Sequence, residues 1–440
     1  MCSRDSCSDE STKPNEKINL VGASCRKCTT VKASVVLQGK FPYCRQCFLA
    51  YFSHKFNAVL GKSKIMKSGD KILLAFSGSP SSICLLDLVQ NYIDERRRKK
   101  ISTSAVLLYI EEAFLFDKTP EERSELLNEI YNALLLYDFK TFYASYDSFF
   151  DEEIMLYKSP SSLLDSTDNS RMSKLLEDCT TDTAKIDLLV KAKNDVLVKA
   201  ARWLQCNKIF LADTSDHIAV NVISNVSLGR GSQLVSDIGF CDDRFGDILF
   251  IRPLQDCSKK EVAYFNVFND LRSITIPSFG TKDDKFSSIQ KLTETFVNQL
   301  KTSFPSTVPT VVSTGNKLTA SENGDNICRL CHAKVESNTN ELSAQHATTV
   351  SGQISNLGPN AFESSTFEPL EEQSISDKNG CCGSPENNVS QDQLSEYLCY
   401  GCRLILKDSK STENWPSIIK TNSESQIKEM EDEIKKFLID

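Results

Sequence analysis

The feature that most constrains the fold is a buried strand that runs through a turn of small residues into a helix, over residues 71–90. The unbroken apolar run 72–76 is typical of a strand that is buried on both faces, as in a parallel sheet. The turn Ser-Gly-Ser-Pro-Ser-Ser follows, in which Ser79 suits an N-cap and Pro80 suits the first helical turn. Free backbone N–H groups at this end of a helix suit an anion or a phosphate, although an ordinary strand-to-helix connection has the same pattern.

Strand-like and helix-like segments alternate from this turn to about residue 275. The expected strands cover 71–77, 104–110, 140–144, 208–212 and 247–251, and the expected helices cover 79–97, 120–137, 183–205 and 215–228. This alternation predicts an α/β domain over 68–302 with a parallel, doubly wound sheet, which binds ligands at the carboxyl ends of its strands. Residues 158–182, rich in Ser and Asp, are expected to form an insertion loop.

Two Cys-x-x-Cys pairs precede the α/β domain, Cys25/Cys28 and Cys44/Cys47. This spacing is typical of one tetrahedral zinc held by four thiolates, with a hairpin between the pairs. We therefore predict a zinc ribbon over residues 21–67. A RING-type site fits less well, because a second set of ligands is missing and His54 is the only histidine nearby.

A second pair of knuckles, Cys328/Cys331 and Cys399/Cys402, lies in the region 303–440. We predict that they form a second, split zinc site, with redox-active or free cysteines as the alternative. The 67 intervening residues are tolerable, since loop closure costs only about 0.6 kcal/mol more for each doubling of length. Cys381 and Cys382 could compete as ligands. The insert 336–393 has a disordered composition, and 423–439 is predicted to be a charged helix.

Charge is segregated along the chain. The formal net charge is −8, yet residues 18–67 contain nine Lys or Arg and no Asp or Glu, which leaves −17 for the remainder. Such segregation indicates local binding of a polyanion, and RNA suits a basic surface with interleaved aromatic residues. We expect the charges to face the RNA and the aromatic residues to form the small core that a ribbon needs. The candidate RNA-binding residues here are Arg26, Lys27, Lys32, Lys40, Arg45 and Lys55. The basic run 96–100 is interpreted instead as favourable charge at the end of a helix.

The start of the chain has no apolar core of a signal peptide, and no run of 18 apolar residues occurs. We expect a disordered tail over 1–20, no membrane association and a cytoplasmic protein. Seventeen cysteines in such a protein indicate metal binding rather than disulfides.

The turn after the first strand resembles the pyrophosphatase loop of adenylating enzymes that modify tRNA, in which Ser-Gly-Gly-x-Asp-Ser follows a buried strand. Ser77, Gly78 and Ser82 match this pattern, whereas Ser79 stands for the second glycine and Ser81 for the aspartate. The segment 209–219 resembles a later block of these enzymes. In it, Asp216 matches one residue of an acidic pair and His217 replaces the other. The resemblance therefore implies an adenine-nucleotide α-hydrolase-like fold whose loop has lost its metal-organising carboxylate.

Three further blocks resemble the same enzymes: Leu-Gly-Arg-Gly at 228–231, Ile-Arg-Pro-Leu at 251–254 and Lys-Lys-Glu-Val at 259–262. They add Arg230 and Arg252 to the candidate RNA-binding residues. Together with the cysteine pairs, they resemble the family of second subunits of the cytoplasmic tRNA 2-thiolation complex. This resemblance implies a heterodimer with a catalytic sister subunit that binds ATP and magnesium. It also implies action on the wobble uridine of tRNA, with sulfur from a ubiquitin-like carrier protein.

The cysteines of the α/β domain do not suit sulfur chemistry. The catalytic relatives resemble one another in a cysteine pair plus a third cysteine, but no Cys-x-x-Cys occurs over 71–302. We interpret Cys84, Cys179, Cys206, Cys241 and Cys257 as small hydrophobic or inert residues. The sequence thus predicts a subunit without catalytic residues. Two alternatives remain: an ATP-dependent sulfurtransferase that uses Ser82, Asp216 and an external cysteine, or a zinc-ribbon scaffold that binds only protein.

Overall fold

The computed structural model describes residues 22–420 except 39, 117, 167, 275–286, 320–325, 336–393 and 396. The predicted tail over 1–20, the insert 336–393 and the helix 423–439 lie outside the described residues. Among the residues described, no helix is both long enough and apolar enough to cross a membrane.

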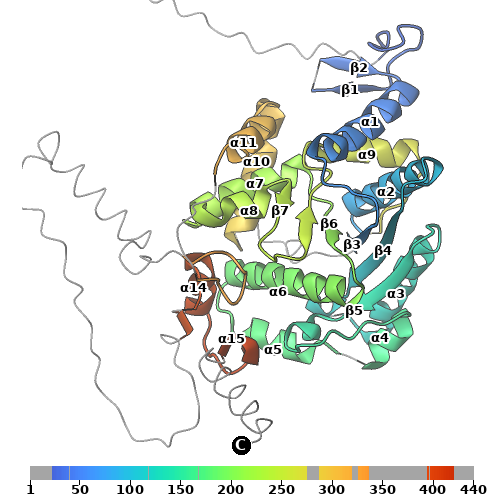
Figure 1. The fold of residues 1–440 in the computed structure, drawn as a ribbon. Coiled ribbons are helices and arrows are strands. Elements are labelled where there is room, and N and C mark those ends of the chain that lie inside the picture. Colours follow the sequence, from blue (N-terminus) through green and yellow to red (C-terminus); the bar gives the residue numbers. More distant parts are fainter. Residues whose placement is uncertain are drawn as a thin grey trace, which may run out of the picture.

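A six-stranded sheet forms the centre of the molecule, in the order β5-β4-β3-β6-β8-β7 (Figure 1). The first five strands are parallel, and only the edge strand β7 is antiparallel to its neighbour. The predicted parallel sheet is therefore confirmed. The strands are β3 (Asp70–Phe76), β4 (Thr103–Ile110), β5 (Lys140–Ala144), β6 (Lys208–Phe210), β7 (Cys241–Asp242) and β8 (Leu249–Ile251).

The chain reverses direction across the sheet after β5. It runs outward from β3 through β4 to β5, then returns to place β6 on the other side of β3. The turn after β3 consequently lies at the topological switch point, where doubly wound sheets bind ligands.

Two cores cover the two faces of the sheet. One contains β3 residues such as Leu74 together with α1 (Arg45–Ser63), α2 (Pro80–Arg98), α3 (Pro120–Leu134), α4 (Pro160–Ser166) and α9 (Lys259–Phe268). The other packs α5 (Ser170–Asp178), α6 (Asp182–Trp203), α14 (Tyr400–Lys407) and α15 (Ser417–Lys420) against the opposite face. A third, smaller cluster joins α7 (Ser215–Ser227), α8 (Leu234–Ile238), α10 (Ile289–Ser303) and α11 (Thr307–Gly315).

Local sequence signals start several of these helices. Thr119 and Glu122 form a capping box at α3, and Ser258 and Glu261 form one at α9. Each box satisfies two of the backbone N–H groups that a helix leaves without partners at its start. In α2, the side chain of Ser79 caps the helix as expected.

Two segments differ from the prediction. Residues 158–182 are not a loop, because they contain α4 and α5, and Met172 and Leu175 of α5 are buried in the core. The second half of the expected ribbon is α1, a helix of 19 residues. Its stripe of Phe48, Phe52, Phe56 and Leu60 is fully buried against α9 and α2, so this helix belongs to the α/β core.

Candidate metal clusters and nucleotide loop

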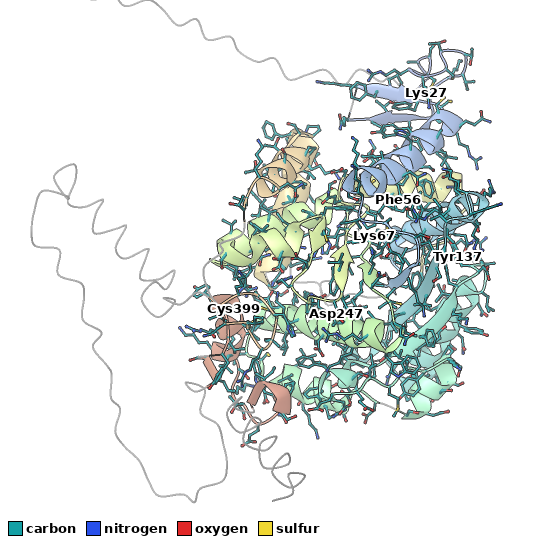
Figure 2. The ribbon with its side chains drawn as sticks, viewed as in Figure 1. Lys27, Phe56, Lys67, Tyr137, Asp247 and Cys399 are labelled. Carbon is teal, nitrogen blue, oxygen red and sulfur yellow. The ribbon has the colours of Figure 1, made fainter. Side chains whose placement is uncertain are left out.

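The N-terminal cysteine cluster comprises Cys25, Cys28, Cys44 and Cys47, whose four sulfurs lie within 4.8 Å of one another. A hairpin of β1 (Val35–Leu37) and β2 (Phe41–Tyr43) joins its two knuckles. In the first knuckle, the N–H of Cys25 donates to the carbonyl of Val31 at 2.9 Å. In the second, Cys44 is the N-cap of α1. The hairpin lies at the edge of the molecule, where Figure 2 labels Lys27.

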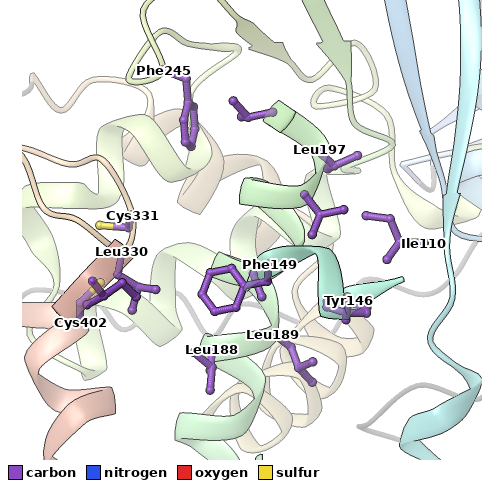
Figure 3. Packing of buried hydrophobic residues seen from close by; sticks show 14 of the residues in the cluster. Ile110, Tyr146, Phe149, Leu188, Leu189, Leu197, Phe245, Leu330, Cys331 and Cys402 are labelled. Atoms are coloured by element: carbon purple, nitrogen blue, oxygen red, sulfur yellow. The ribbon is translucent and has the colours of Figure 1, made fainter. Parts of the chain in front are cut away.

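The C-terminal cluster comprises Cys328, Cys331, Cys399 and Cys402, also within 4.8 Å of one another, and all four are buried. Cys399 is the N-cap of α14, and Cys402 lies in its first turn. Figure 3 shows Cys331 and Cys402 beside Leu330, near α6 residues that include Leu188 and Leu189. The fold thus brings together two knuckles that are 67 residues apart in the sequence.

Both clusters fit a metal ion held by four thiolates. Sulfurs about 2.3 Å from a tetrahedral zinc would lie about 3.8 Å from one another. Cys28 Sγ and Cys44 Sγ are 3.9 Å apart, and Cys331 Sγ and Cys399 Sγ are 3.4 Å apart. Each set can therefore hold a metal ion; zinc remains our prediction for its identity.

Two of the N-terminal thiols, Cys28 and Cys47, differ in acidity. Hydrogen bonds from the Thr30 side chain and from the backbone of Val31 lower the pKa of Cys28 to about 6. Desolvation and the neighbouring Cys44 raise the pKa of Cys47 to about 12. Since thiolates repel one another, a metal ion is what would allow all four to ionise together.

The predicted RNA-binding residues fall into two groups. Arg26 and Lys27 are exposed within the first knuckle, Lys32 is exposed just after it, and Lys40 is exposed on the hairpin. The guanidinium of Arg26 lies 4.3 Å from the centre of the Phe41 ring, which orients it without neutralising it. Arg45 is also exposed, although it donates to the carbonyl of Phe268 and lies 3.7 Å from Asp270.

The other three basic candidates are committed to internal partners. Lys55 pairs with Glu261 at 3.1 Å, between α1 and α9. Arg230 is buried and donates to Asp187. Arg252 is buried, with 3.1 Å to Asp213 and 2.7 Å to the carbonyl of Gly239. The prediction of RNA contacts for Arg230 and Arg252 therefore needs correction, because buried and paired guanidinium groups do not face a solvent-exposed ligand. For Lys55, the ion pair indicates a structural role.

Hydrogen bonds among its own serines and to Ile274 stabilise the turn after β3. Ser79 Oγ accepts from the N–H of Ser82 at 3.3 Å, and Ser77 Oγ lies 3.0 Å from Ser79 Oγ. Gly78 adopts the left-handed region (φ 73°). Its carbonyl accepts from the N–H of Ile274 at 3.2 Å. One of the donors that would face a phosphate is thus already satisfied by the N-cap side chain.

Asp216, the remaining acidic residue of the family pattern, is buried and fully engaged. Its Oδ2 accepts from the backbone N–H of Lys259 at 2.6 Å, and its Oδ1 pairs with the ammonium of Lys301 from α10. Lys301 is 85 residues away in the sequence, so no local pattern could have revealed this partner. An ammonium group takes the position that a cation would occupy at this carboxylate.

The nearby Asp213 is an ionised carboxylate whose charge is balanced by a neighbouring cation, Arg252. Burial alone would raise the pKa of Asp213, but His217 and Arg252 together hold it well below its usual range. His217, which replaces the second member of the acidic pair, is exposed and lies with Nδ1 2.8 Å from Asp213 Oδ1.

The α/β-domain cysteines are dispersed, as predicted. Burial raises the pKa of Cys84 well above that of a free thiol and raises the pKa of Cys257 to about 12, so neither is a reactive thiolate. In the described part of the chain, only the two flanking four-cysteine sets gather three or more metal-ligating side chains.

Comparison with known proteins places this architecture in a family. The family described as "Cytoplasmic tRNA 2-thiolation protein 2" matches residues 288–404. A Xenopus tropicalis protein of that name is 30% identical over 96% of this chain and 95% of its own length. The chain belongs to the cytoplasmic tRNA 2-thiolation protein 2 family. A Danio rerio member is 29% identical over 97% of this chain and 96% of its own length.

A solved structure agrees with this family assignment at the level of the fold. U34-tRNA thiolase NcsA from Methanococcus maripaludis, solved with its [4Fe-4S] cluster, has a TM-score of 0.53. It is 16% identical over 76% of this chain and 96% of its own length. The resemblance inferred from the degenerate loop and the cysteine pairs is therefore confirmed, and so is the α/β fold.

Proposed function

We propose that this chain is a non-catalytic subunit of a cytoplasmic heterodimer that 2-thiolates the wobble uridine of tRNA. One observation carries this proposal: the only carboxylate left from the family's acidic pair is buried and already bonded to the Lys301 ammonium and to the backbone N–H of Lys259. A magnesium ion needs oxygen ligands with free lone pairs and open coordination positions. Each oxygen of the buried Asp216 already has a partner, one of them a cation, and Ser81 has no charge to offer, so the residues present do not fit Mg²⁺-ATP.

The chemistry would therefore reside in a catalytic sister subunit, which binds ATP and magnesium and receives sulfur from a ubiquitin-like carrier protein. Our chain contributes assembly and tRNA binding. The exposed Arg26, Lys27, Lys32 and Lys40 support the second role, because residues 22–43, which carry them, contain no acidic side chain. Bound zinc would fix this hairpin and thereby position the four charges.

Reconstitution tests the proposal. The full chain, the sister subunit and the two together are assayed for thiolation of an unmodified tRNA transcript and for pyrophosphate release. We expect no turnover by this chain alone, turnover by the pair, and no effect of Ser81→Ala here. The matched control removes the aspartate of the sister's own loop and should abolish activity. Pyrophosphate release by this chain alone would overturn the proposal, and complex formation without tRNA protection would favour a protein-only scaffold.

A further inference from the structure

The fold brings together two basic segments that the sequence separates. Residues 62–67 follow and end α1, and residues 96–100 end α2. Arg96 donates from Nη2 to the carbonyl of Lys67 at 3.0 Å and from Nε to the hydroxyl of Thr103 at 2.7 Å. A backbone bond from Gly69 to Ser102, 2.8 Å long, joins the same two turns. These contacts define one surface, which we call the basic edge.

The basic edge has more positive charge than the favourable interaction with two helix C-termini explains. It carries eight basic side chains: Lys62, Lys64, Lys67, Arg96, Arg97, Arg98, Lys99 and Lys100. Three acidic groups balance part of it, since Arg97 pairs with Asp94 and Asp138 and Lys99 pairs with Glu95. The ammonium groups of Lys62, Lys64, Lys67 and Lys100 are exposed, and they make no ion pair or side-chain hydrogen bond with any described residue.

The basic edge and the hairpin lie at opposite ends of α1. α1 has 19 residues, so it spans about 28 Å between Cys44 and the first lysines of the edge. Its buried stripe faces the core, whereas Gln46, Ala50 and His54 are exposed along its outer side. α1 contains no acidic residue. Figure 2 labels Lys27 on the hairpin, Phe56 within α1 and Lys67 beyond its far end.

We propose that the basic edge is a second tRNA-binding surface, which extends the hairpin site along the outer side of α1 and contacts the phosphate backbone. The inference rests on the proposed function, because it takes tRNA as the ligand. Exposed, unpaired lysines at both ends of an acid-free helix suit a polyanion longer than a nucleotide, since each phosphate contact releases condensed counterions. Lysines without neighbouring hydrogen-bond acceptors or stacking aromatics suit phosphates rather than bases.

The location also separates this surface from the chemistry. β3 and β4 begin at the basic edge, with Asp70 opposite Thr103. The degenerate loop follows the other end of β3, and the seven residues of the strand place it about 20 Å away. The basic edge therefore binds tRNA away from the reacting nucleotide, as a positioning surface requires.

Titration of the full chain with an in vitro transcribed tRNA, at several salt concentrations, tests the inference. The test variant carries Lys62→Gln, Lys64→Gln, Lys67→Gln and Lys100→Gln. The control variant carries Lys140→Gln, Lys158→Gln, Lys174→Gln and Lys317→Gln, four exposed lysines from other parts of the described structure. We expect the test variant to lose at least about tenfold in affinity and about three units of the logarithmic salt slope, and the control to match the wild type.

A third variant, with Arg26→Gln, Lys27→Gln and Lys32→Gln, separates the two proposals. If only this variant and not the test variant weakens binding, the basic edge is not a tRNA surface, although the proposed function stands. If the unaltered chain does not bind tRNA, the proposed function itself fails. If the test variant keeps its tRNA affinity but no longer co-purifies with the sister subunit, the edge binds an acidic protein surface and the inference is overturned.

Discussion

The two four-cysteine clusters have the same local construction. In each, the residue after the first knuckle takes a left-handed conformation, Thr29 with φ 58° and His332 with φ 57°. An isolated antiparallel bridge flanks each first knuckle, Ser24 with Lys32 and Ile327 with Lys334. The second knuckle starts a helix whose N-cap is a cysteine in both clusters. The same unit has therefore been used twice in one chain.

Their surroundings differ completely. The C-terminal sulfurs lie in the main core beside α6, whereas Cys28 and Cys47 of the N-terminal cluster are only partly buried. Burial by itself would lower the pKa of Lys191, but Asp237 and the thiols of Cys331 and Cys402 raise it, so this lysine stays charged beside the C-terminal cluster. We infer that one cluster joins distant parts of the core, whereas the other fixes a basic hairpin at the edge of the core, onto which the hairpin packs through Val35 and Leu37.

The largest effect is expected from breaking the C-terminal cluster. Cys402→Ser removes a ligand in the core, and loss of a buried metal site should destabilise the whole fold by more than about 5 kcal/mol. Metal analysis and urea unfolding measure this. Cys206→Ser is the matched control, since Cys206 is buried in the same core but outside the cluster. Equal destabilisation by both variants would show that the C-terminal cluster adds nothing beyond apolar packing.

A second prediction tests whether α1 belongs to the core rather than to the N-terminal cluster. Phe52 is fully buried and its ring lies 4.9 Å from that of Phe265. Phe52→Ala should cost about 3–5 kcal/mol because it leaves a large cavity. The metal content should not change. His54→Ala, on the exposed side of the same helix, serves as the control for helix propensity. A loss of metal in Phe52→Ala at full stability would contradict the division between core and hairpin.

The difference between the clusters also shows what the sequence could predict. The four Cys-x-x-Cys pairs were sufficient to predict the two four-cysteine clusters, because the spacing within each pair is a local property. The strand predicted at 140–144 matches β5, since Phe142–Ala144 follow a clear helix signal that ends at residue 137. The helix α1 was missed, although Phe48, Phe52, Phe56 and Leu60 recur at every fourth position, because the cysteine spacing favoured a ribbon.

Long-range charge pairing accounts for the remaining errors. Arg230 and Arg252 were predicted at an RNA surface from their family blocks, but Asp187 and Asp213 hold them inside the protein. The partner of Asp216 comes from α10, far along the chain. Whether a charge is exposed depends on such distant partners, and a single sequence does not reveal them.

A third prediction follows from this distinction between buried and exposed cations. Arg230→Gln leaves Asp187 without its guanidinium partner in a buried position, which typically costs about 3 kcal/mol. Urea unfolding should show this loss of stability, while the salt dependence of tRNA affinity of the folded protein stays unchanged. Arg26→Gln should leave the stability unchanged and reduce the salt dependence of tRNA affinity. If Arg230→Gln reduced the salt dependence of tRNA affinity at unchanged stability, Arg230 would contact the RNA after all.

The smallest effect on stability is expected from the N-terminal cluster, and it tests the comparison most directly. Cys25→Ser should remove one metal ion per chain and loosen the hairpin, because the hairpin has only two strands of three residues and cannot remain ordered alone. The buried stripe of α1 is untouched, and the hairpin adds Val35 and Leu37 at the edge of the core, so the midpoint of global unfolding should fall much less than in Cys402→Ser. Hydrogen exchange should accelerate in the hairpin and not in β3. Binding of tRNA should weaken, since the hairpin cations would lose their fixed positions. A fall of the urea midpoint as large as in Cys402→Ser would mean that both clusters stabilise the core equally and that their different surroundings carry no functional meaning.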